Sequence, residues 1–163
     1  MTHDDYMRMA LAEAQKAMDA GEVPVGAVIV KDGAVIASAH NQVETLSDGT
    51  AHAELLALQR ASEHIGDWRL DGCLLYVTKE PCPMCIGAAV NCRIAHLIFG
   101  CPDTRTGGPQ TLAIAQMPNA LHQVEITSGI LEEDCRNILK EFFRNRRCAA
   151  SDSCNGVSLI LLT

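Results

Sequence analysis

No stretch of the sequence approaches the roughly 20 consecutive apolar residues that a membrane-spanning helix requires. The longest apolar run late in the chain, from Val157 to Leu162, is far too short and contains Ser158. The N-terminal segment MTHDDYMRMA is acidic and amphipathic, and it lacks the basic flank and the apolar core of a secretory signal. These absences predict a cytoplasmic protein without contact to a membrane.

Positive charge is also scarce. Thirteen Lys and Arg residues stand against twenty Asp and Glu residues, which gives a formal net charge of −7. Such a balance argues against broad, nonspecific binding of nucleic acid. The segment 140–147, KEFFRNRR, is the exception, because it holds four cations and one acid. A small basic edge on an acidic body favours a limited contact that depends on shape.

Internal repeats and domain-sized linkers are absent as well. With 163 residues, 48% of them hydrophobic, the chain is long enough for one domain with a buried core. We predict one domain over residues 1–147 and a flexible tail over residues 148–163. Cysteine, in contrast, is abundant, with eight residues in all. In the absence of a secretion signal, clustered cysteines more often bind a metal or take part in chemistry than form disulfides.

The order of the expected elements indicates an α/β fold. Two β-branched runs, 23–30 and 34–39, flank Asp32-Gly33, which is a strong hairpin signal. Apolar spacing and helix-start residues predict the remaining elements. These are helices over 3–20, 52–65, 83–91 and 130–147, and strands over 73–78, 94–99 and 122–127. Strands that alternate with helices after a hairpin predict a mixed sheet covered on both faces.

Two short motifs about 30 residues apart carry the chemistry, HAE at 52–54 and PCPMC at 81–85. Each lies at an expected helix start, where unpaired N–H groups and the helix dipole favour thiolates. One His and two Cys give three zinc ligands and leave the fourth tetrahedral position for water, as in a catalytic site. Zinc lowers the pKa of bound water to roughly 7, and a carboxylate that is not a ligand can carry the proton. We therefore predict one Zn²⁺ per chain on His52, Cys82 and Cys85, with Glu54 as the catalytic proton carrier.

The HAE motif also constrains the backbone. Two residues apart in a regular helix, His52 and Glu54 would point away from each other, so His52 must lie at the non-helical boundary. Two plainer explanations use fewer of these residues. A structural zinc site has no use for Glu54, and a thioredoxin-like dithiol uses neither His52 nor Glu54. The full pattern H-x-E…P-C-x-x-C is the signature of zinc-dependent deaminases. Four further cysteines are explained as core residues: Cys73, Cys92, Cys101 and Cys135.

Over about residues 5–147 the sequence resembles the bacterial tRNA-specific adenosine deaminases of the cytidine-deaminase-like superfamily. The segments that carry the resemblance are EVPVGAVIV, TAHAELLAL, LYVTKEPCPMC, IFGCPDTRTG and ITSGILEEDCRNILKEFFRNRR. The zinc motif is shared across the superfamily and specifies the chemistry, whereas Phe-Phe-Arg-x-Arg-Arg is typical of the branch that acts on tRNA. The resemblance implies a three-layer α/β/α fold with a five-stranded mixed sheet, and a homodimer with the active site near the interface.

The same resemblance assigns the substrate contacts. Asn41 matches a pocket residue that contacts the ribose of a flipped nucleotide, and Asp103 matches a loop residue that contacts the backbone of the anticodon loop. Phe143, Arg144 and Arg147 match positions near the tRNA. Each assignment has a plainer alternative. Asn41 holds a turn, Asp103 caps the Thr-rich loop, and the arginines end a helix favourably.

The sequence departs from the family pattern in the loop 107–111, where Pro109 removes a backbone donor, and at Lys79, where an apolar residue is expected. The motif PCPMC also occurs in guanine deaminases. Phe142 and Phe143 cannot both face the core from one side of a helix, so one of them is expected to be half-exposed and available to stack on a base.

Three functions are therefore weighed. The first is hydrolysis of adenosine to inosine at the wobble position of a tRNA, with release of ammonia. The alternative is deamination of a free nucleobase such as guanine, or of a related small purine, by the same catalytic residues. A third is a binding module without catalysis. The complete set of metal ligands and proton carrier argues against the third, because function is inferred from the site.

Overall fold

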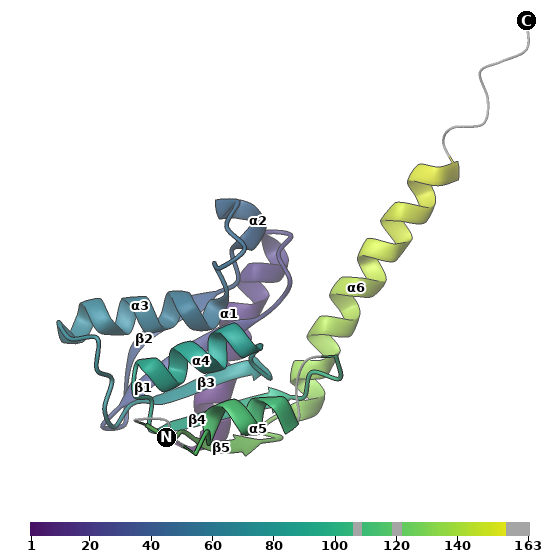
Figure 1. The fold of residues 1–163 in the computed structure, drawn as a ribbon. Coiled ribbons are helices and arrows are strands. Elements are labelled where there is room, and N and C mark those ends of the chain that lie inside the picture. Colours follow the sequence, from purple (N-terminus) through teal and green to yellow (C-terminus); the bar gives the residue numbers. More distant parts are fainter. Residues whose placement is uncertain (106–108, 119–121, 156–163) are drawn as a thin grey trace, which may run out of the picture.

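A five-stranded mixed sheet organises the part of the chain that the computed structural model describes, residues 1–105, 109–118 and 122–155 (Figure 1). The strands run in the order β2-β1-β3-β4-β5. β1 is antiparallel to both β2 and β3, whereas β3, β4 and β5 are parallel to one another. The strands are β1 (Gly26–Lys31), β2 (Ala34–His40), β3 (Leu74–Lys79), β4 (His96–Cys101) and β5 (Glu125–Ser128).

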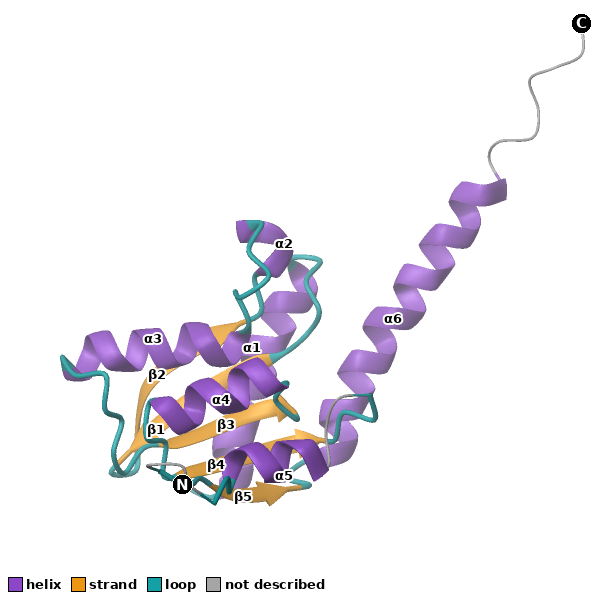
Figure 2. Cartoon of the chain, in the orientation of Figure 1, coloured by secondary structure: helices purple, strands orange, loops and turns teal. Residues whose placement is uncertain are grey.

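Helices cover both faces of this sheet (Figure 2). They are α1 (His3–Asp19), α2 (Val43–Leu46), α3 (Ala53–Ile65), α4 (Pro83–Asn91), α5 (Pro109–Ala115) and α6 (Glu132–Asn155). On one face α3, α4 and α5 pack over side chains such as Leu97, and on the other α1 and the start of α6 pack over side chains such as Ile98. Successive strand residues point to opposite faces, so each strand supplies both cores. The predicted α/β/α fold with a five-stranded mixed sheet is confirmed.

The end of α1 fixes where the chain enters the site. Gly21 has φ +76°, and its N–H donates to the carbonyl of Met18 while the N–H of Glu22 donates to the carbonyl of Ala17. This pair of bonds is the Schellman arrangement, which needs a left-handed residue that glycine adopts without strain. The expected helix stop at Gly21 is therefore confirmed, and residues 22–25 leave α1 in a fixed direction.

Gly26 at the start of β1 lets α1 lie directly on the sheet. A Cβ atom built there would overlap the carbonyl oxygen of Ala10 and would lie 2.5 Å from the amide nitrogen of Ala14. Both of these are backbone atoms of α1, which cannot move aside as the tip of a side chain can. Gly26 thus sets the distance between the first helix and the first strand.

The strands differ from the predictions at their ends. The apolar run 23–30 was expected to be strand throughout, but β1 begins only at Gly26, and Val23 and Val25 line a cavity instead. The last strand was expected over 122–127 and is found at Glu125–Ser128. There the N–H of Val124 donates to the carbonyl of Ala115 in α5, which takes Val124 out of the strand pairing.

Two short helices were not expected. α2 lies within the polar segment 40–51, and α5 begins at Pro109 in what was expected to be a loop. Proline suits the first position of a helix, because an N–H there has no intrahelical partner to lose. The departure at Pro109 is thus accommodated as a helix start.

The final helix was predicted to end at Arg147, but α6 continues to Asn155. The sequence has no Gly or Pro between Gly129 and Gly156, so no helix breaker stands at the expected end. Residues 148–155 of the predicted flexible tail continue this helix, and residues 156–163 lie outside the described residues. Within the described ranges, none of the helices has the length and apolar character needed to cross a bilayer.

Candidate metal centre and active site

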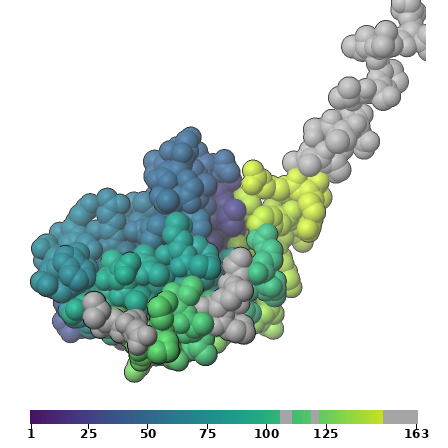
Figure 3. Space-filling model, viewed as in Figure 1, coloured from purple at the N-terminus to yellow at the C-terminus, as the bar shows by residue number. Residues whose placement is uncertain are grey.

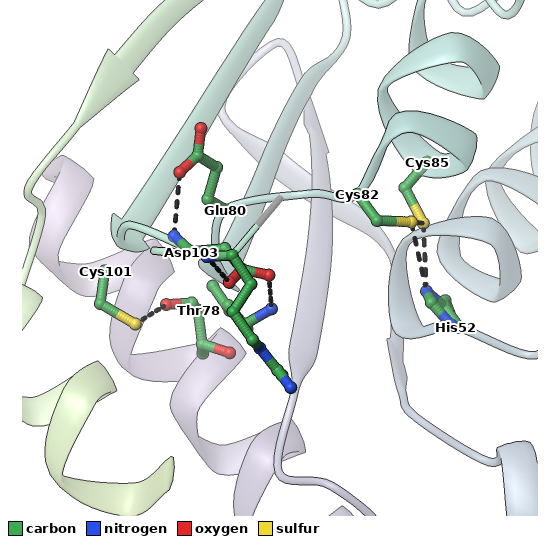
Figure 4. A network of polar contacts seen from close by, with 9 residues as sticks. His52, Thr78, Glu80, Cys82, Cys85, Cys101 and Asp103 are labelled. Carbon is green, nitrogen blue, oxygen red and sulfur yellow. Dashed lines mark hydrogen bonds and ion pairs between the residues drawn. The ribbon is translucent and has the colours of Figure 1, made fainter. Parts of the chain in front are cut away.

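His52, Cys82 and Cys85 are brought together by the starts of two helices. His52 is the N-cap of α3 with φ −74° and ψ 150°, and Cys82 is the N-cap of α4 with φ −71° and ψ 167°. Both are extended residues, as the spacing of His52 and Glu54 required. Neither side chain caps its own helix, so both point elsewhere. Cys85 lies in the first turn of α4, on the side of Cys82 (Figure 4).

The distances within this cluster fit a tetrahedral zinc ion. The Nδ1 atom of His52 lies 3.7 Å from the Sγ atom of Cys82 and 3.4 Å from that of Cys85, and the two sulfurs are 3.6 Å apart. Zinc bonds of about 2.3 Å to sulfur and about 2.0 Å to nitrogen at tetrahedral angles would place the sulfurs about 3.8 Å apart and each sulfur about 3.5 Å from the nitrogen. Among the described residues, this is the only group of three or more His, Cys, Asp or Glu side chains with such spacing.

The two thiols shift each other's pKa in opposite directions. Hydrogen bonds from Cys85 and His52 lower the pKa of Cys82 to about 3. The sulfur of Cys82 and burial raise the pKa of Cys85 far above its ordinary value. A metal ion between the sulfurs would stabilise both as thiolates, because its positive charge offsets the repulsion between them.

Glu54 is the second residue of α3 and lines the same cavity as His52 and Cys82. Its side chain is only 4% exposed, and burial raises its pKa. A raised pKa favours the protonated form of the carboxyl group, which suits a group that exchanges protons.

The cavity in front of these residues has a volume of about 320 Å³. This is at the lower end of the range of small-molecule sites and suits a single nucleobase with part of its sugar. One wall consists of the segment after α1 together with α2, and the opposite wall consists of the end of β3 and side chains of α6. A pocket with a potential metal centre at one side and a buried carboxyl beside it can position a water molecule against a bound ring.

The predicted substrate-contacting residues are placed differently from one another. Asn41 is buried and lines the cavity. Phe143 lines it too and is 40% exposed, whereas Phe142 is 5% exposed and packs inward, so the expected division of the two rings is confirmed. Arg144 and Arg147 are exposed on α6 and are not among the cavity residues.

Arg146 was expected only as one of the cations of the segment 140–147, yet it lines the cavity together with Leu139 and Phe143. These three lie along one face of α6, at helical spacing. The guanidinium carbon of Arg146 lies 5.4 Å from the centre of the Phe142 ring, within the range of a cation–π contact. The helical spacing from Leu139 through Phe143 was the signal that could have selected Arg146 from the sequence.

Asp103 serves the loop that follows β4. Its carboxylate is paired with the ammonium of Lys79 and accepts the N–H of Arg105 at 2.9 Å. Its own N–H donates to Glu80 at 2.9 Å (Figure 4). Lys79, the unexpected cation at the end of β3, thus has an acidic partner on the neighbouring strand end. These contacts agree with the plainer explanation of Asp103 as a loop residue, and its contact with RNA stays a prediction.

Comparison with known proteins identifies the class. The chain belongs to the family of MafB19-like deaminases, whose model matches residues 1–147. In particular, it is 48% identical over 149 residues to the tRNA-specific adenosine deaminase of Bacillus subtilis strain 168, and the match covers 90% of this chain and 92% of that protein. The predicted family is confirmed, and the chain is an enzyme of the deaminase class.

Solved structures agree with this assignment. A tRNA:A34 deaminase, from a study of A-to-I editing at the wobble position, superposes with a TM-score of 0.78 at 40% identity, covering 83% of this chain and 99% of that one. The guanine deaminase of Bacillus subtilis superposes with a TM-score of 0.61 at 42% identity, covering 64% of this chain and 67% of its own. The likeness to the tRNA deaminase is therefore the more extensive of the two.

Proposed function

We propose that this chain hydrolyses adenosine to inosine at the wobble position of a tRNA and releases ammonia. The observation that carries the proposal is the cluster of His52, Cys82 and Cys85 at one side of a base-sized cavity, with Glu54 buried beside it. Near-complete coverage of the tRNA-specific adenosine deaminases supports the choice of substrate.

In this proposal His52, Cys82 and Cys85 hold one Zn²⁺. When bound, the ion supplies an activated water molecule at neutral pH. Glu54 transfers protons between that water, N1 of the purine and the amine that leaves C6. The net reaction consumes one water and yields inosine and ammonia. The cavity walls orient the purine and exclude bulk water, which keeps the attacking and leaving groups aligned.

The RNA would reach the cavity past α6. Phe143 lines the cavity and is half-exposed, which supports a role in stacking on a base next to the one that is flipped. Arg144, Arg146 and Arg147 would contact phosphates, with Arg146 nearest the cavity. We also retain Asn41 as the contact to the ribose and Asp103 as a contact to the anticodon-loop backbone.

A homodimer in the cytoplasm completes the proposal. Figure 3 shows the side of the molecule formed by α4 and α5. Exposed apolar side chains on or beside these helices are Met84, Leu112 and Met117, with Trp68 in the loop after α3. Exposed apolar side chains gathered on adjacent helices favour burial against a second copy. Light scattering at micromolar concentration should report a dimer, and a monomer would contradict this part.

Free guanine is the second candidate substrate, because the guanine deaminase of Bacillus subtilis is 42% identical in the matched region. The two candidates are separated by an ammonia-release assay on four substrates: an anticodon stem-loop, adenosine, guanine and cytosine. We expect turnover on the stem-loop, with inosine at the wobble position. Turnover on guanine with none on the stem-loop would replace the proposed substrate by the free base.

The metal is tested separately. Purified protein should contain one zinc per chain, and Cys82→Ser combined with Cys85→Ser should remove it, since one ligand cannot hold the ion. Cys92→Ser is the matched control, because Cys92 is half-buried and lies outside the cluster. Full zinc content in the double variant would contradict the assignment of ligands.

A further inference from the structure

Glu22 is an acid in the wall of the cavity for which the proposed chemistry has no use. It follows α1, lines the cavity and is only 1% exposed. An ionised carboxylate this deeply buried destabilises the fold unless hydrogen bonds compensate it. Its contacts therefore indicate what it does.

Two of these contacts are to the start of α2. Oε1 of Glu22 accepts the N–H of Thr45 at 2.7 Å, and Oε2 accepts the N–H of Glu44 at 3.2 Å. Every helix leaves its first N–H groups without intrahelical partners, and an N-cap side chain normally accepts them. The N-cap residue of α2, Gln42, makes no such bond. Glu22 thus caps α2 from a distant part of the chain.

The third contact is to Asn41, which donates from Nδ2 to Oε2 of Glu22 at 3.2 Å. A carboxylate can only accept, so this bond fixes which end of the Asn41 amide is the nitrogen. The carbonyl oxygen of that amide and its second N–H are left for other partners. The main chain of Asn41 is held as well, because its N–H donates to the carbonyl of Val25 at 3.0 Å.

Glu22 itself has a fixed backbone. Its N–H is the donor that closes the Schellman arrangement on Ala17 at the end of α1, at 2.9 Å. The carboxylate therefore links three parts of the chain: the end of α1, the start of α2 and Asn41. Asn41, Val43 and Glu44 all line the cavity beside it.

We propose that Glu22 is a positioning residue of the deaminase: it holds the Asn41 amide and α2 as one wall of the cavity, so that Asn41 presents a single hydrogen-bonding orientation to the nucleotide. This inference rests on the proposed function, in which Asn41 contacts the substrate. Glu22 acts through Asn41. Among the described residues, its carboxylate makes no hydrogen bond or ion pair with the metal ligands or with Glu54.

Electrostatics agree with this role. Burial raises the pKa of Glu22, but the hydrogen bonds from Thr45 and Glu44 outweigh burial and leave the pKa below its ordinary value. A lowered pKa favours the ionised form of Glu22, which is the form that accepts these hydrogen bonds. An acid–base catalyst would instead need a pKa near the working pH.

The test is a double-mutant cycle on the zinc-loaded protein, with kcat and KM measured on the anticodon stem-loop. Glu22→Gln keeps the shape but turns one acceptor into a donor, which allows the Asn41 amide to rotate. We expect kcat/KM to fall about 10- to 100-fold, as for loss of a hydrogen bond to a charged group, with zinc content unchanged. Asn41→Ala should cause a similar fall. In the Asn41→Ala background, Glu22→Gln should have almost no further effect.

Glu13→Gln is the matched control. Glu13 in α1 is another buried acid, and its carboxylate accepts hydrogen bonds from Lys16, Ser38 and His40. It does not line the cavity. The Glu13→Gln substitution should lower the melting temperature without changing kcat/KM. If Glu22→Gln behaves in the same way, or if its full effect persists in the Asn41→Ala background, the positioning role is overturned.

Two further experiments cover a variant that fails to fold and a protein that acts on guanine. If Glu22→Gln fails to fold, Gln42→Ser can give α2 a cap of its own, and the cycle is repeated in that background, where the loss of kcat/KM should remain. If wild-type protein deaminates guanine and not the stem-loop, the proposed substrate fails on that result alone. The cycle run on guanine then tests Glu22 independently, with the same expected pattern.

Discussion

Glu22 and Glu54 face the same cavity, yet their surroundings shift their pKa values in opposite directions. Burial dominates at Glu54 and raises its pKa. At Glu22 burial also raises the pKa, but the N–H groups of α2 outweigh it and the pKa is lowered. Pairs of acids that are shifted apart in this way divide the work between a group that exchanges protons and a group that stays charged. At the scale of residues, this contrast supports the proposed roles of Glu54 as the proton carrier and of Glu22 as the anion that holds Asn41.

The proton-carrier role of Glu54 predicts a separation of turnover from metal binding. Glu54→Gln keeps the volume of the side chain and removes its ability to exchange a proton. We expect turnover on the stem-loop to fall by at least about 10²-fold, while zinc stays at one per chain. Single-turnover kinetics together with metal analysis of the same preparation measure both quantities. Near-normal turnover in the variant would show that another group carries the proton.

Glu13 predicts how stability depends on pH. Burial raises the pKa of Glu13, but hydrogen bonds from Lys16, His40 and Ser38 outweigh burial and lower it below its ordinary value of 4.5. A group whose pKa is lowered in the folded state stabilises the fold above its unfolded-state pKa, and this contribution is lost as the pH falls through the folded-state pKa.

The measurement is urea unfolding of wild type and Glu13→Gln from pH 7 down to pH 3. The variant should be less stable at pH 7, and the difference in the free energy of unfolding should shrink below about pH 4.5 as the wild-type carboxylate is protonated. A difference that stays constant down to pH 3 would show that the ionised form of Glu13 contributes nothing. His40 contacts the Glu13 carboxylate, so His40→Asn is measured in parallel.

At the scale of elements, the sequence predicts best where a residue type has one use. The prediction of His52 at a helix boundary follows from its spacing to Glu54, and that of the stop at Gly21 from the left-handed backbone it requires. α2 could not be predicted, because its cap is Glu22, which lies 22 and 23 residues before the two N–H groups that it accepts. The end of α6 could not be predicted from a stop signal, because none stands near Arg147. Arg146 could have been selected by its helical spacing to Leu139 and Phe143, but which face of α6 meets the cavity depends on packing.

The packing of α1 on β1 yields a prediction at the same scale. Gly26→Ala should destabilise the fold by about 2–3 kcal/mol or more, the upper range for overpacking, because the new methyl group meets backbone atoms of α1 on both sides. Gly49→Ala is the matched control, since no atom lies within 4 Å of the added Cβ and the backbone there is not left-handed. Thermal unfolding of both variants decides between them. Equal melting temperatures would show that α1 shifts away from β1 without loss.

At the scale of the whole molecule, the acidic net charge disfavours RNA binding, whereas the cations of α6 beside the cavity favour it. The body is acidic, with a formal net charge of −7 for the chain, so it does not attract RNA in general. The cations gather on α6, whose inner face reaches the cavity through Leu139, Phe143 and Arg146. RNA would therefore be bound where the arginines of α6 and the cavity can be reached together. Under the proposed function, such an arrangement would favour a structured loop that presents one base.

Salt dependence tests this arrangement. Each phosphate contact that is lost should flatten the log–log slope of affinity against salt concentration by about 0.7 on a single-stranded loop. Arg144→Ala and Arg146→Ala form a matched pair on the same helix, of which only Arg146 lines the cavity. Both should flatten the slope if both contact phosphates, but only Arg146→Ala should also lower kcat/KM on a short anticodon stem-loop, because its contact is nearest the reacting base.

Phe143→Ala should weaken binding by about 1–3 kcal/mol without changing the slope, because stacking releases no counterions. If the slope of affinity against salt concentration is unchanged when Arg144→Ala and Arg146→Ala are combined, α6 does not bind the RNA backbone.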